Sequence, residues 1–358
     1  MTLFDSPAFE GHEGVHAFSD EKTGLKAIIA VHSTARGPAA GGCRMWPYAS
    51  AEDALTDALK LSRAMSYKNA MADLELGGGK SVIIGDARTQ KTPALFEAFG
   101  RAVEGLGGKY WTAEDVGVSV ADLTAARKHT RYVAGLEGHA AASGDPSPVT
   151  AEGVFRGVRL CVQRGLKRDL DGVRVAIQGV GNVGAHLAEK LHAAGAKLVL
   201  TDVNAEALRR VAAATDAQIV APSAIFDADV DVFAPCALGG AVSLDTLPRI
   251  RAKIIAGGAN NQLADAEAGG ELFNRGILYA PDYVINGGGI INVAGEIRAL
   301  ESGGAFDPAW VDEKLDRLAL TLEEVLEQAL RERRPTHEVA NEIARSRIVG
   351  AAEKRAAA

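Results

Sequence analysis

Two lysines and one aspartate are the residues best suited to chemistry in this sequence. Lys80 follows the glycines at 77–79, Lys68 lies near the end of an expected helix, and Asp115 lies in the expected loop 112–117. One ammonium could hold a substrate carboxylate, while like-charge repulsion and desolvation make the other readier to act as a base. A buried carboxylate could carry a proton to and from an amine. The set suits an α-amino acid as substrate, although each lysine alone is equally typical of a surface residue.

The segment 77–81 has some features of a phosphate-binding P-loop, but it departs from that pattern twice. The P-loop has a glycine six positions before its lysine, where this chain has Leu74. A P-loop also follows a strand and precedes a helix, whereas here the strand is expected afterwards, over 81–84. The glycines instead predict a flexible backbone that lets a small ligand approach closely.

The residues from His12 to His16 match the H-E-x-x-H pattern of zinc proteases. That pattern binds zinc only on a helix, where both histidines share one face. Gly11 and Gly14 disfavour a helix at this place. We therefore expect no metal site here.

A glycine fingerprint of the G-x-G-x-x-G type follows the strand expected over 173–178 and opens the helix expected over 183–194. It consists of Gly179, Val180, Gly181, Asn182, Val183 and Gly184. In this context the pattern predicts a dinucleotide site, with the pyrophosphate at the helix N-terminus. Asp202 ends the next strand, where a carboxylate can accept hydrogen bonds from the adenosine ribose and would repel a 2′-phosphate. We therefore expect NAD rather than NADP.

The composition excludes several classes of protein. A chain of 358 residues predicts two domains. The net charge of −7 argues against nucleic acid as a partner. No apolar run is long enough for a membrane span, and the N-terminal residues do not resemble an export signal. The three cysteines are far apart, as is typical of free thiols in a cytoplasmic protein.

The pattern of apolar residues predicts an α/β protein of two domains. The segment 143–148, rich in proline and glycine, is the expected hinge. Residues 1–144 would form an α/β domain, which the C-terminal helices over 330–358 could join, and the resemblance given below implies that this domain binds substrate and forms the oligomer. Residues 145–329 would form a Rossmann-type domain, because strands alternate there with helices and predict a parallel sheet. The other expected elements are helices over 52–71, 93–106, 150–164 and 205–214, and strands over 25–32, 197–201, 230–234, 253–256 and 277–279.

Taken together, the motifs resemble the glutamate/leucine/phenylalanine/valine dehydrogenase superfamily, most closely its leucine dehydrogenase branch. The resemblance extends from about residue 24 to 297. Its motifs are GPAAGGCRMW (37–46), SYKNAMADLELGGGK (66–80), TAEDVG (112–117), GDPSPVTAEGV (144–154), QGVGNVG (178–184), APCALGG (234–240), GGANNQL (257–263) and APDYVINGGG (280–289).

The resemblance implies NAD-dependent, reversible oxidative deamination in a cleft between the two domains. Lys80 would be the base that activates water, and Asp115 would carry protons to and from the substrate nitrogen. Lys68 would bind the substrate carboxylate, assisted by the backbone at Gly41 and Gly42. The family forms homo-oligomers, from dimers to octamers, through its N-terminal domain.

The same resemblance implies roles for further residues. Asn261 would contact the substrate amino group. The residues around the nicotinamide and its ribose would be Thr150, Ala237, Asn260 and Asn286. The side-chain pocket would be formed by Ala40, Ala113, Ile290 and Val293.

That pocket is apolar, which favours leucine, valine or isoleucine and disfavours glutamate. Alanine at position 40 is smaller than is usual in the branched-chain enzymes, so phenylalanine or another bulky amino acid is the alternative substrate. Two other classes are a 2-hydroxy-acid dehydrogenase and a non-catalytic NAD-binding protein. The first generally uses a histidine, which does not accompany Lys80 in the sequence. The second has no need of Lys68, Lys80 and Asp115 together.

Overall fold

The computed structural model describes residues 3–357, whose contacts divide the chain into two compact units. Unit 1 comprises Met1–Asp145, Asn292–Val311 and Ala344–Ala358, and unit 2 comprises Pro146–Ile291 and Asp312–Ile343. The sequence prediction placed 292–311 with the dinucleotide-binding domain and 330–343 with the first domain, and the contacts group both segments the other way. No break in the sequence marks these boundaries, because three long helices have residues in both units: α9 (Gly288–Ser302), α10 (Pro308–Glu332) and α11 (Thr336–Ala357).

Unit 1 contains a mixed sheet in the order β1-β2-β5-β3-β6, with β4 beside β5. The neighbours β1, β2 and β5 are antiparallel, whereas β3 and β4 run parallel to β5. Its elements are η1 (Leu3–Asp5), β1 (Gly14–Asp20), β2 (Leu25–Ser33), β3 (Ala39–Ala40), β4 (Cys43–Trp46), α1 (Ala51–Met71), β5 (Gly77–Ile84), α2 (Pro93–Glu104), β6 (Tyr110–Trp111) and α3 (Val120–Arg127).

Helices α1 and α2 cover opposite faces of this sheet. Successive side chains of a strand point to opposite faces. In β2, Ile29 packs in the same cluster as Phe96 of α2, whereas Ala30 packs with Leu59 of α1. In β5, Val82 belongs to the cluster that includes α1. Even-numbered residues of β5 therefore point towards α1.

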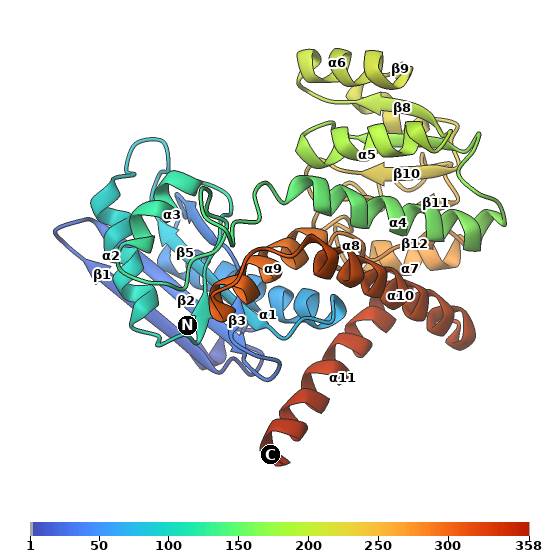
Figure 1. Ribbon diagram of the computed structural model, residues 1–358. Helices are drawn as coiled ribbons and strands as arrows, with labels where there is room; N and C mark the ends of the chain where they lie inside the picture. Colours follow the sequence, from blue (N-terminus) through green and yellow to red (C-terminus); the bar gives the residue numbers. More distant parts are fainter. Residues whose placement is uncertain (1–2, 358) are drawn as a thin grey trace. The chain divides into compact units, whose positions relative to one another are not determined.

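Unit 2 contains a sheet in the order β12-β11-β10-β7-β8-β9, parallel throughout. Figure 1 shows α5 and α6 beside β8 of this sheet. The elements are α4 (Ser147–Leu166), β7 (Arg174–Gln178), α5 (Asn182–Ala193), β8 (Lys197–Thr201), α6 (Ala205–Thr215), β9 (Gln218–Ile219), η2 (Pro222–Asp227), β10 (Val232–Pro235), β11 (Ile254–Ile255), α7 (Ala266–Asn274), β12 (Leu278–Tyr279) and α8 (Asp282–Ile285).

The predicted fold class, a two-domain α/β protein with a Rossmann-type sheet, is confirmed. The predicted helices and strands are present, with ends that differ by a few residues. One strand is wrong at its start: β5 begins at Gly77, not at 81, so the glycines before Lys80 lie in the sheet rather than in a flexible loop. No helix among residues 3–357 is long and apolar enough to cross a membrane.

A buried histidine, His12, and a half-buried one, His32, lie between the sheet of unit 1 and α1. The Nε2 atom of His12 lies 3.0 Å from the Leu59 carbonyl oxygen, and the Nδ1 atom of His32 lies 2.7 Å from the Ser66 Oγ. The two imidazole centroids are 4.9 Å apart. Burial, together with repulsion from His12, lowers the pKa of His32 to about 4, and burial lowers the pKa of His12 as well. Since β1 begins at Gly14, the His12–His16 segment is not helical.

We predict that these histidines make unit 1 less stable as the pH falls. The pKa of His32 is about 4 in the folded state against an ordinary value of 6.5, so the unfolded state binds the proton first. The free energy of unfolding should therefore fall from about pH 6.5 to about pH 4, by up to about 1.4 kcal/mol per pH unit from His32, and His12 should contribute with the same sign. Urea unfolding at several pH values measures this. His32→Gln should flatten the dependence and the exposed His192→Gln should not; equal slopes for both variants would contradict it.

Candidate active site

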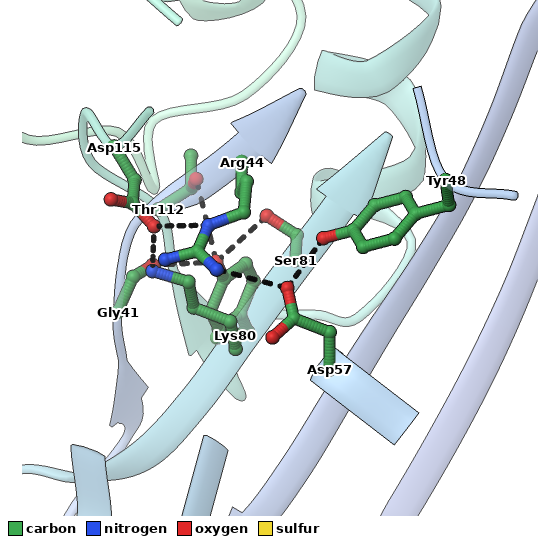
Figure 2. Close-up of polar contacts among 9 residues, drawn as sticks. Gly41, Arg44, Tyr48, Asp57, Lys80, Ser81, Thr112 and Asp115 are labelled. Atoms are coloured by element: carbon green, nitrogen blue, oxygen red, sulfur yellow. Dashed lines mark hydrogen bonds and ion pairs between the residues drawn. The ribbon is translucent and has the colours of Figure 1, made fainter. Parts of the chain in front are cut away.

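The centre of the site in unit 1 is an ion pair between Lys80 and Asp115 (Figure 2). The Lys80 side chain is only 7% exposed, and its Nζ donates to Oδ2 of Asp115, which is 22% exposed. A buried ammonium is costly unless a carboxylate or other acceptor balances it. The structure therefore brings together two of the three residues predicted to be catalytic.

The strand β5 fixes the direction of the Lys80 side chain. Lys80 is paired with Ala30 and alternates with Ser81, so it leaves the sheet on the face covered by α1. Arg44 in β4 alternates in the same way between Cys43 and Met45, both of which pack on the α2 side. The side chains of Lys80 and Arg44 consequently meet on one face of the sheet.

Asp115 lies in the segment after β6, close to the backbone of the glycine pair 41–42. The Ala113 carbonyl oxygen accepts a hydrogen bond from the Cys43 N–H at 2.8 Å. A Cβ atom at Gly42 would lie 2.9 Å from the Asp115 Cβ and 2.3 Å from the Glu114 carbonyl oxygen. Only glycine at position 42 allows this close approach.

The charge of Asp115 is set by two cations. Burial by itself would raise the pKa of its carboxyl group, but Lys80 and Arg44 outweigh burial and hold this pKa below its usual value. Asp115 is therefore an anion at neutral pH.

Arg44, which sequence reasoning missed, connects Asp115 to α1. Its Nε lies 3.3 Å from Oδ2 of Asp115, and its Nη1 lies 3.0 Å from Oδ2 of Asp57. The Tyr48 hydroxyl donates to the same Asp57 oxygen at 2.5 Å. Arg44 lies within the motif at 37–46, in which the prediction gave roles to the glycines and to Ala40 but not to Arg44. Its partners are distant along the chain, so only the fold reveals the network.

The glycines before Lys80 allow close packing inside the protein rather than flexibility. A Cβ atom at Gly78 would lie 2.1 Å from the Ser66 backbone nitrogen of α1, and one at Gly77 would lie 2.0 Å from the Ser33 carbonyl oxygen. A Cβ at Gly79 would lie 2.7 Å from the ring of Tyr110. The expected close approach exists, but the approaching groups belong to the chain itself.

The structure changes the expectation for Gly41. Its N–H donates to the Trp111 carbonyl oxygen at 3.2 Å, so it is used inside the protein and is not directed at a substrate. Its carbonyl oxygen accepts from the Tyr110 hydroxyl at 2.6 Å. Binding of a carboxylate by the backbone at Gly42 stays a prediction.

Lys68 lies in the last turn of α1 and is half-buried. It lies one turn beyond Met65. The Met65 side chain lies beside Gly41, because a Cβ atom added to Gly41 would come close to it. The end of the helix is held by α11, since Arg345 donates to the Tyr67 hydroxyl at 2.7 Å and Arg347 to the Ala70 carbonyl oxygen at 3.1 Å. This turn of α1 is thus fixed on both sides of Lys68.

In unit 2 the glycine fingerprint has the geometry that a dinucleotide needs. Gly179 has a φ of +96°, and a Cβ at Gly184 would lie 2.0 Å from the Gly179 carbonyl oxygen. At Gly181, the N-cap of α5, a Cβ would meet no atom within 4 Å. The first and third glycines are required by the protein's own packing. The second leaves open space before the helix N-terminus, as expected for a pyrophosphate.

Asp202, predicted to accept from a ribose, supports the fingerprint loop. Its Oδ2 accepts from the Val180 N–H at 2.6 Å and its Oδ1 from the Asn204 N–H at 2.7 Å. A carboxylate with two lone-pair sites on each oxygen can still accept from a ligand.

The residues predicted around the nicotinamide lie together in unit 2. The Asn286 Nδ2 donates to the Asn260 Oδ1 at 2.8 Å. The next residue, Asn261, was predicted to contact the substrate amino group and adopts a φ of +51°, a conformation uncommon for residues other than glycine. A Cβ at Gly179 would lie 2.8 Å from the Ala237 Cβ, and one at Gly289 would lie 2.9 Å from the Thr150 Oγ1.

The apolar residues predicted to form the substrate pocket are divided between the two units. Ala40 and Ala113 are buried in unit 1. Ile290 and Val293 are half-buried on one face of α9, with Ile290 in unit 2 and Val293 in unit 1.

Glu296, one turn after Val293, is a second residue that sequence reasoning missed. It is 0% exposed, and its carboxylate accepts from the backbone N–H groups of Gly135 and Ser143 at 3.0 and 3.2 Å and from the Ser143 hydroxyl at 2.7 Å. It thereby ties the segment before the expected hinge to α9. Among residues 3–357, no group of three or more acidic, histidine or cysteine side chains is arranged to hold a metal ion.

Comparison with known families matches both halves of the chain. Residues 12–132 match the Glu/Leu/Phe/Val dehydrogenase dimerisation domain, and residues 145–205 and 199–356 match the glutamate/leucine/phenylalanine/valine dehydrogenase domain. The chain belongs to the Glu/Leu/Phe/Val dehydrogenase family. It is therefore an oxidoreductase of the pyridine-nucleotide-dependent amino-acid dehydrogenases, as the resemblance predicted.

Several members of this family are similar over most of the chain. A leucine dehydrogenase of Geobacillus stearothermophilus is 47% identical over 97% of this chain and 94% of its own length. A valine dehydrogenase of Streptomyces virginiae is 48% identical over 84% of this chain and 85% of its own length. The crystal structure of L-tryptophan dehydrogenase from Nostoc punctiforme superposes with a TM-score of 0.84, at 39% identity, over 95% of this chain and 97% of that one.

We predict that Gly181→Ala leaves this dehydrogenase folded but weakens pyridine-nucleotide binding. The added methyl group meets no protein atom within 4 Å, but it would occupy the space in front of the α5 N-terminus. The dissociation constant, measured by fluorescence titration of the reduced nucleotide, should rise about tenfold or more, or about 1.4 kcal/mol. Gly270→Ala in α7, whose Cβ would also meet nothing within 4 Å, is the control. Unchanged affinity in Gly181→Ala would refute the assignment.

Proposed function

We propose that this dehydrogenase catalyses the NAD-dependent, reversible oxidative deamination of leucine, valine or isoleucine to the 2-oxo acid and ammonia. The observation that carries this proposal is the ion pair of the buried Lys80 with the half-buried Asp115. It supplies a base and a proton carrier on one face of a sheet. The half-buried Lys68 on α1 supplies a second ammonium in the same unit, suited to a substrate carboxylate.

In the proposed mechanism Lys80 and Asp115 transfer protons, whereas Lys68 binds the substrate. NAD, held by the fingerprint loop at 179–184, would supply the hydride acceptor, and loss of hydride from the substrate α-carbon would leave an iminium ion. Lys80 takes a proton from the water that attacks this iminium carbon. Asp115 takes a proton from the substrate ammonium before hydride transfer and later returns it to the nitrogen, and the carbinolamine then collapses to ammonia, the 2-oxo acid and a proton. Lys68, with the backbone at Gly42, holds the substrate carboxylate in place.

NAD is proposed as the cofactor because of Asp202. Its carboxylate lies beside the fingerprint loop, bonded to the Val180 N–H, and Val203 and Asn204 add no positive charge after it. A 2′-phosphate at this place would be repelled. Thr150, Asn260 and Asn286 are proposed to surround the nicotinamide and its ribose.

The branched-chain substrates are proposed from the apolar character of Ala40, Ala113, Ile290 and Val293, together with the similarity to a leucine dehydrogenase and a valine dehydrogenase. The alternative is a bulkier amino acid. It is favoured by the small side chain of Ala40 and by the similarity to a crystal structure of an L-tryptophan dehydrogenase. Homo-oligomerisation through unit 1, a cytoplasmic location and an active site in a cleft remain predictions.

One experiment tests the proposal. Purified protein is assayed for NADH formation with each L-amino acid at alkaline pH, and wild type is compared with Lys80→Ala. Leucine, valine or isoleucine should give the highest turnover, and Lys80→Ala should lose about 10²-fold to 10⁴-fold of it while still binding NADH. Lys60→Ala, which removes an exposed lysine of α1, is the control. A maximum with phenylalanine or tryptophan would favour the alternative, and near-normal turnover of Lys80→Ala would refute the role of Lys80.

A further inference from the structure

One oxygen of Asp115 accepts from two cations of different kinds. Its Oδ2 is the partner of both the Lys80 Nζ and the Arg44 Nε, the latter at 3.3 Å. Figure 2 shows the two side chains converging on this carboxylate. An ammonium can lose its proton, whereas a guanidinium does not under conditions in which a protein is folded. Only Arg44 is therefore a permanent charge beside Asp115.

Arg44 is itself held in place from the side of α1. Asp57 accepts from its Nη1 at 3.0 Å, and the Tyr48 hydroxyl donates to the same Asp57 oxygen. Burial alone would lower the pKa of Arg44, but the charges of Asp115 and Asp57 outweigh burial and hold this pKa above its usual value. Burial and the hydrogen bond to Asp57 raise the pKa of Tyr48, so its hydroxyl stays a neutral donor. The guanidinium has little freedom to leave Asp115.

The proposed reaction changes the charge around Asp115. Lys80 must be neutral before it can take a proton from water, and at that moment Asp115 loses the closer of its two cations. The proton that leaves Lys80 could then settle on Asp115, which would neutralise both residues and break their ion pair. A second, permanent cation opposes this transfer because it favours the carboxylate form.

We propose that Arg44, fixed by Asp57 and Tyr48, is a positioning residue that keeps Asp115 ionised and in place while Lys80 changes its protonation state. This inference rests on the proposed function, because it concerns the same pair. The proton lost by Lys80 then leaves the Lys80–Asp115 pair and does not move to Asp115. Asp115 consequently exchanges protons only with the substrate.

The other titratable groups near the pair leave Arg44 as its permanent positive neighbour. Cys43 of β4 is buried, which raises the pKa of its thiol to about 12, and burial raises the pKa of the Tyr110 hydroxyl as well, so both are neutral. The adjacent Glu114 has a pKa raised by burial. Of the charged groups on the neighbouring elements, Arg44 of β4 pairs with Asp115, Asp57 of α1 pairs with Arg44, and α1 also carries the ammonium of Lys68.

The test is the pH dependence of kcat/KM for oxidative deamination in Arg44 variants. Arg44→Gln removes a cation beside Lys80 and Asp115, so this pair should lose its proton only at higher pH. The acid limb of the kcat/KM profile should therefore move to higher pH by about one unit. Arg44→Lys keeps the charge and should restore the limb towards its wild-type position. Asp57→Asn removes an anion but keeps an oxygen that can accept from Arg44, so the limb should move to lower pH. Arg101→Gln, which breaks an exposed pair with Asp20, should leave it unchanged.

A purely structural role for Arg44 predicts something different. If Arg44 only connects β4 to α1, its variants lose turnover or stability without a signed movement of the acid limb, and Arg44→Lys behaves like Arg44→Gln. That result would overturn the inference. If Arg44→Gln does not fold, Asp57→Asn decides by itself, because an acid limb that stays in place or moves to higher pH would overturn it.

A second measurement does not depend on turnover. Acetic anhydride acetylates only neutral amines, so the pH dependence of Lys80 acetylation, measured by mass spectrometry against the exposed Lys60, reports the protonation of Lys80 directly. The same signed displacements are expected in Arg44→Gln and Asp57→Asn, and their absence would overturn the inference. If the wild type turned over no amino acid, the proposed function would fail, and the labelling would still decide the role of Arg44.

Discussion

The ion pair between Lys80 and Asp115 places an almost fully buried ammonium beside a carboxylate. Burying that charge is unfavourable without a partner, and the packing of unit 1 around Lys80 supplies one. Lys80 leaves β5 on the face covered by α1. Helix α1 lies very close to β5 just before this lysine. Glycine at 78 permits this, since any side chain there would overlap the Ser66 backbone. The same principle applies to Gly42, which lets Asp115 approach from the segment after β6.

Arg44 extends the pair into a network in which charges alternate: Lys80, Asp115, Arg44 and Asp57. Each anion lies beside at least one cation, and the Tyr48 hydroxyl satisfies Asp57 further. The network links β4, β5, α1 and the segment after β6, so the same charges that act on Lys80 and Asp115 also hold together the elements that carry them. Unit 2 uses backbone geometry instead, with Gly179 and Gly184 in close contact and the open position at Gly181 before α5.

Much of this could be predicted from the sequence, for physical reasons that differ between the parts. The parallel sheet of unit 2 was predictable because buried strands and amphipathic helices alternate there with short connections. The pair of Lys80 and Asp115 was predictable as chemistry, since a base and a proton carrier suit an amino acid. The role of the glycines at 77–79 was not, because glycine signals close approach without saying which group approaches. Arg44 and Glu296 were missed because their partners lie far along the chain, and the unit boundaries within α9, α10 and α11 leave no mark in the sequence.

The central claim is that the site performs chemistry on nitrogen, and the reductive direction tests it most directly. The measurement is the oxidation of NADH by the purified enzyme with the 2-oxo acid of leucine, in the presence and absence of ammonium. Because the nitrogen of the product comes from ammonia, the account predicts that NADH is consumed only when ammonium is present and that L-leucine accumulates in equal amount. Consumption without ammonium, with a 2-hydroxy acid as product, would contradict it.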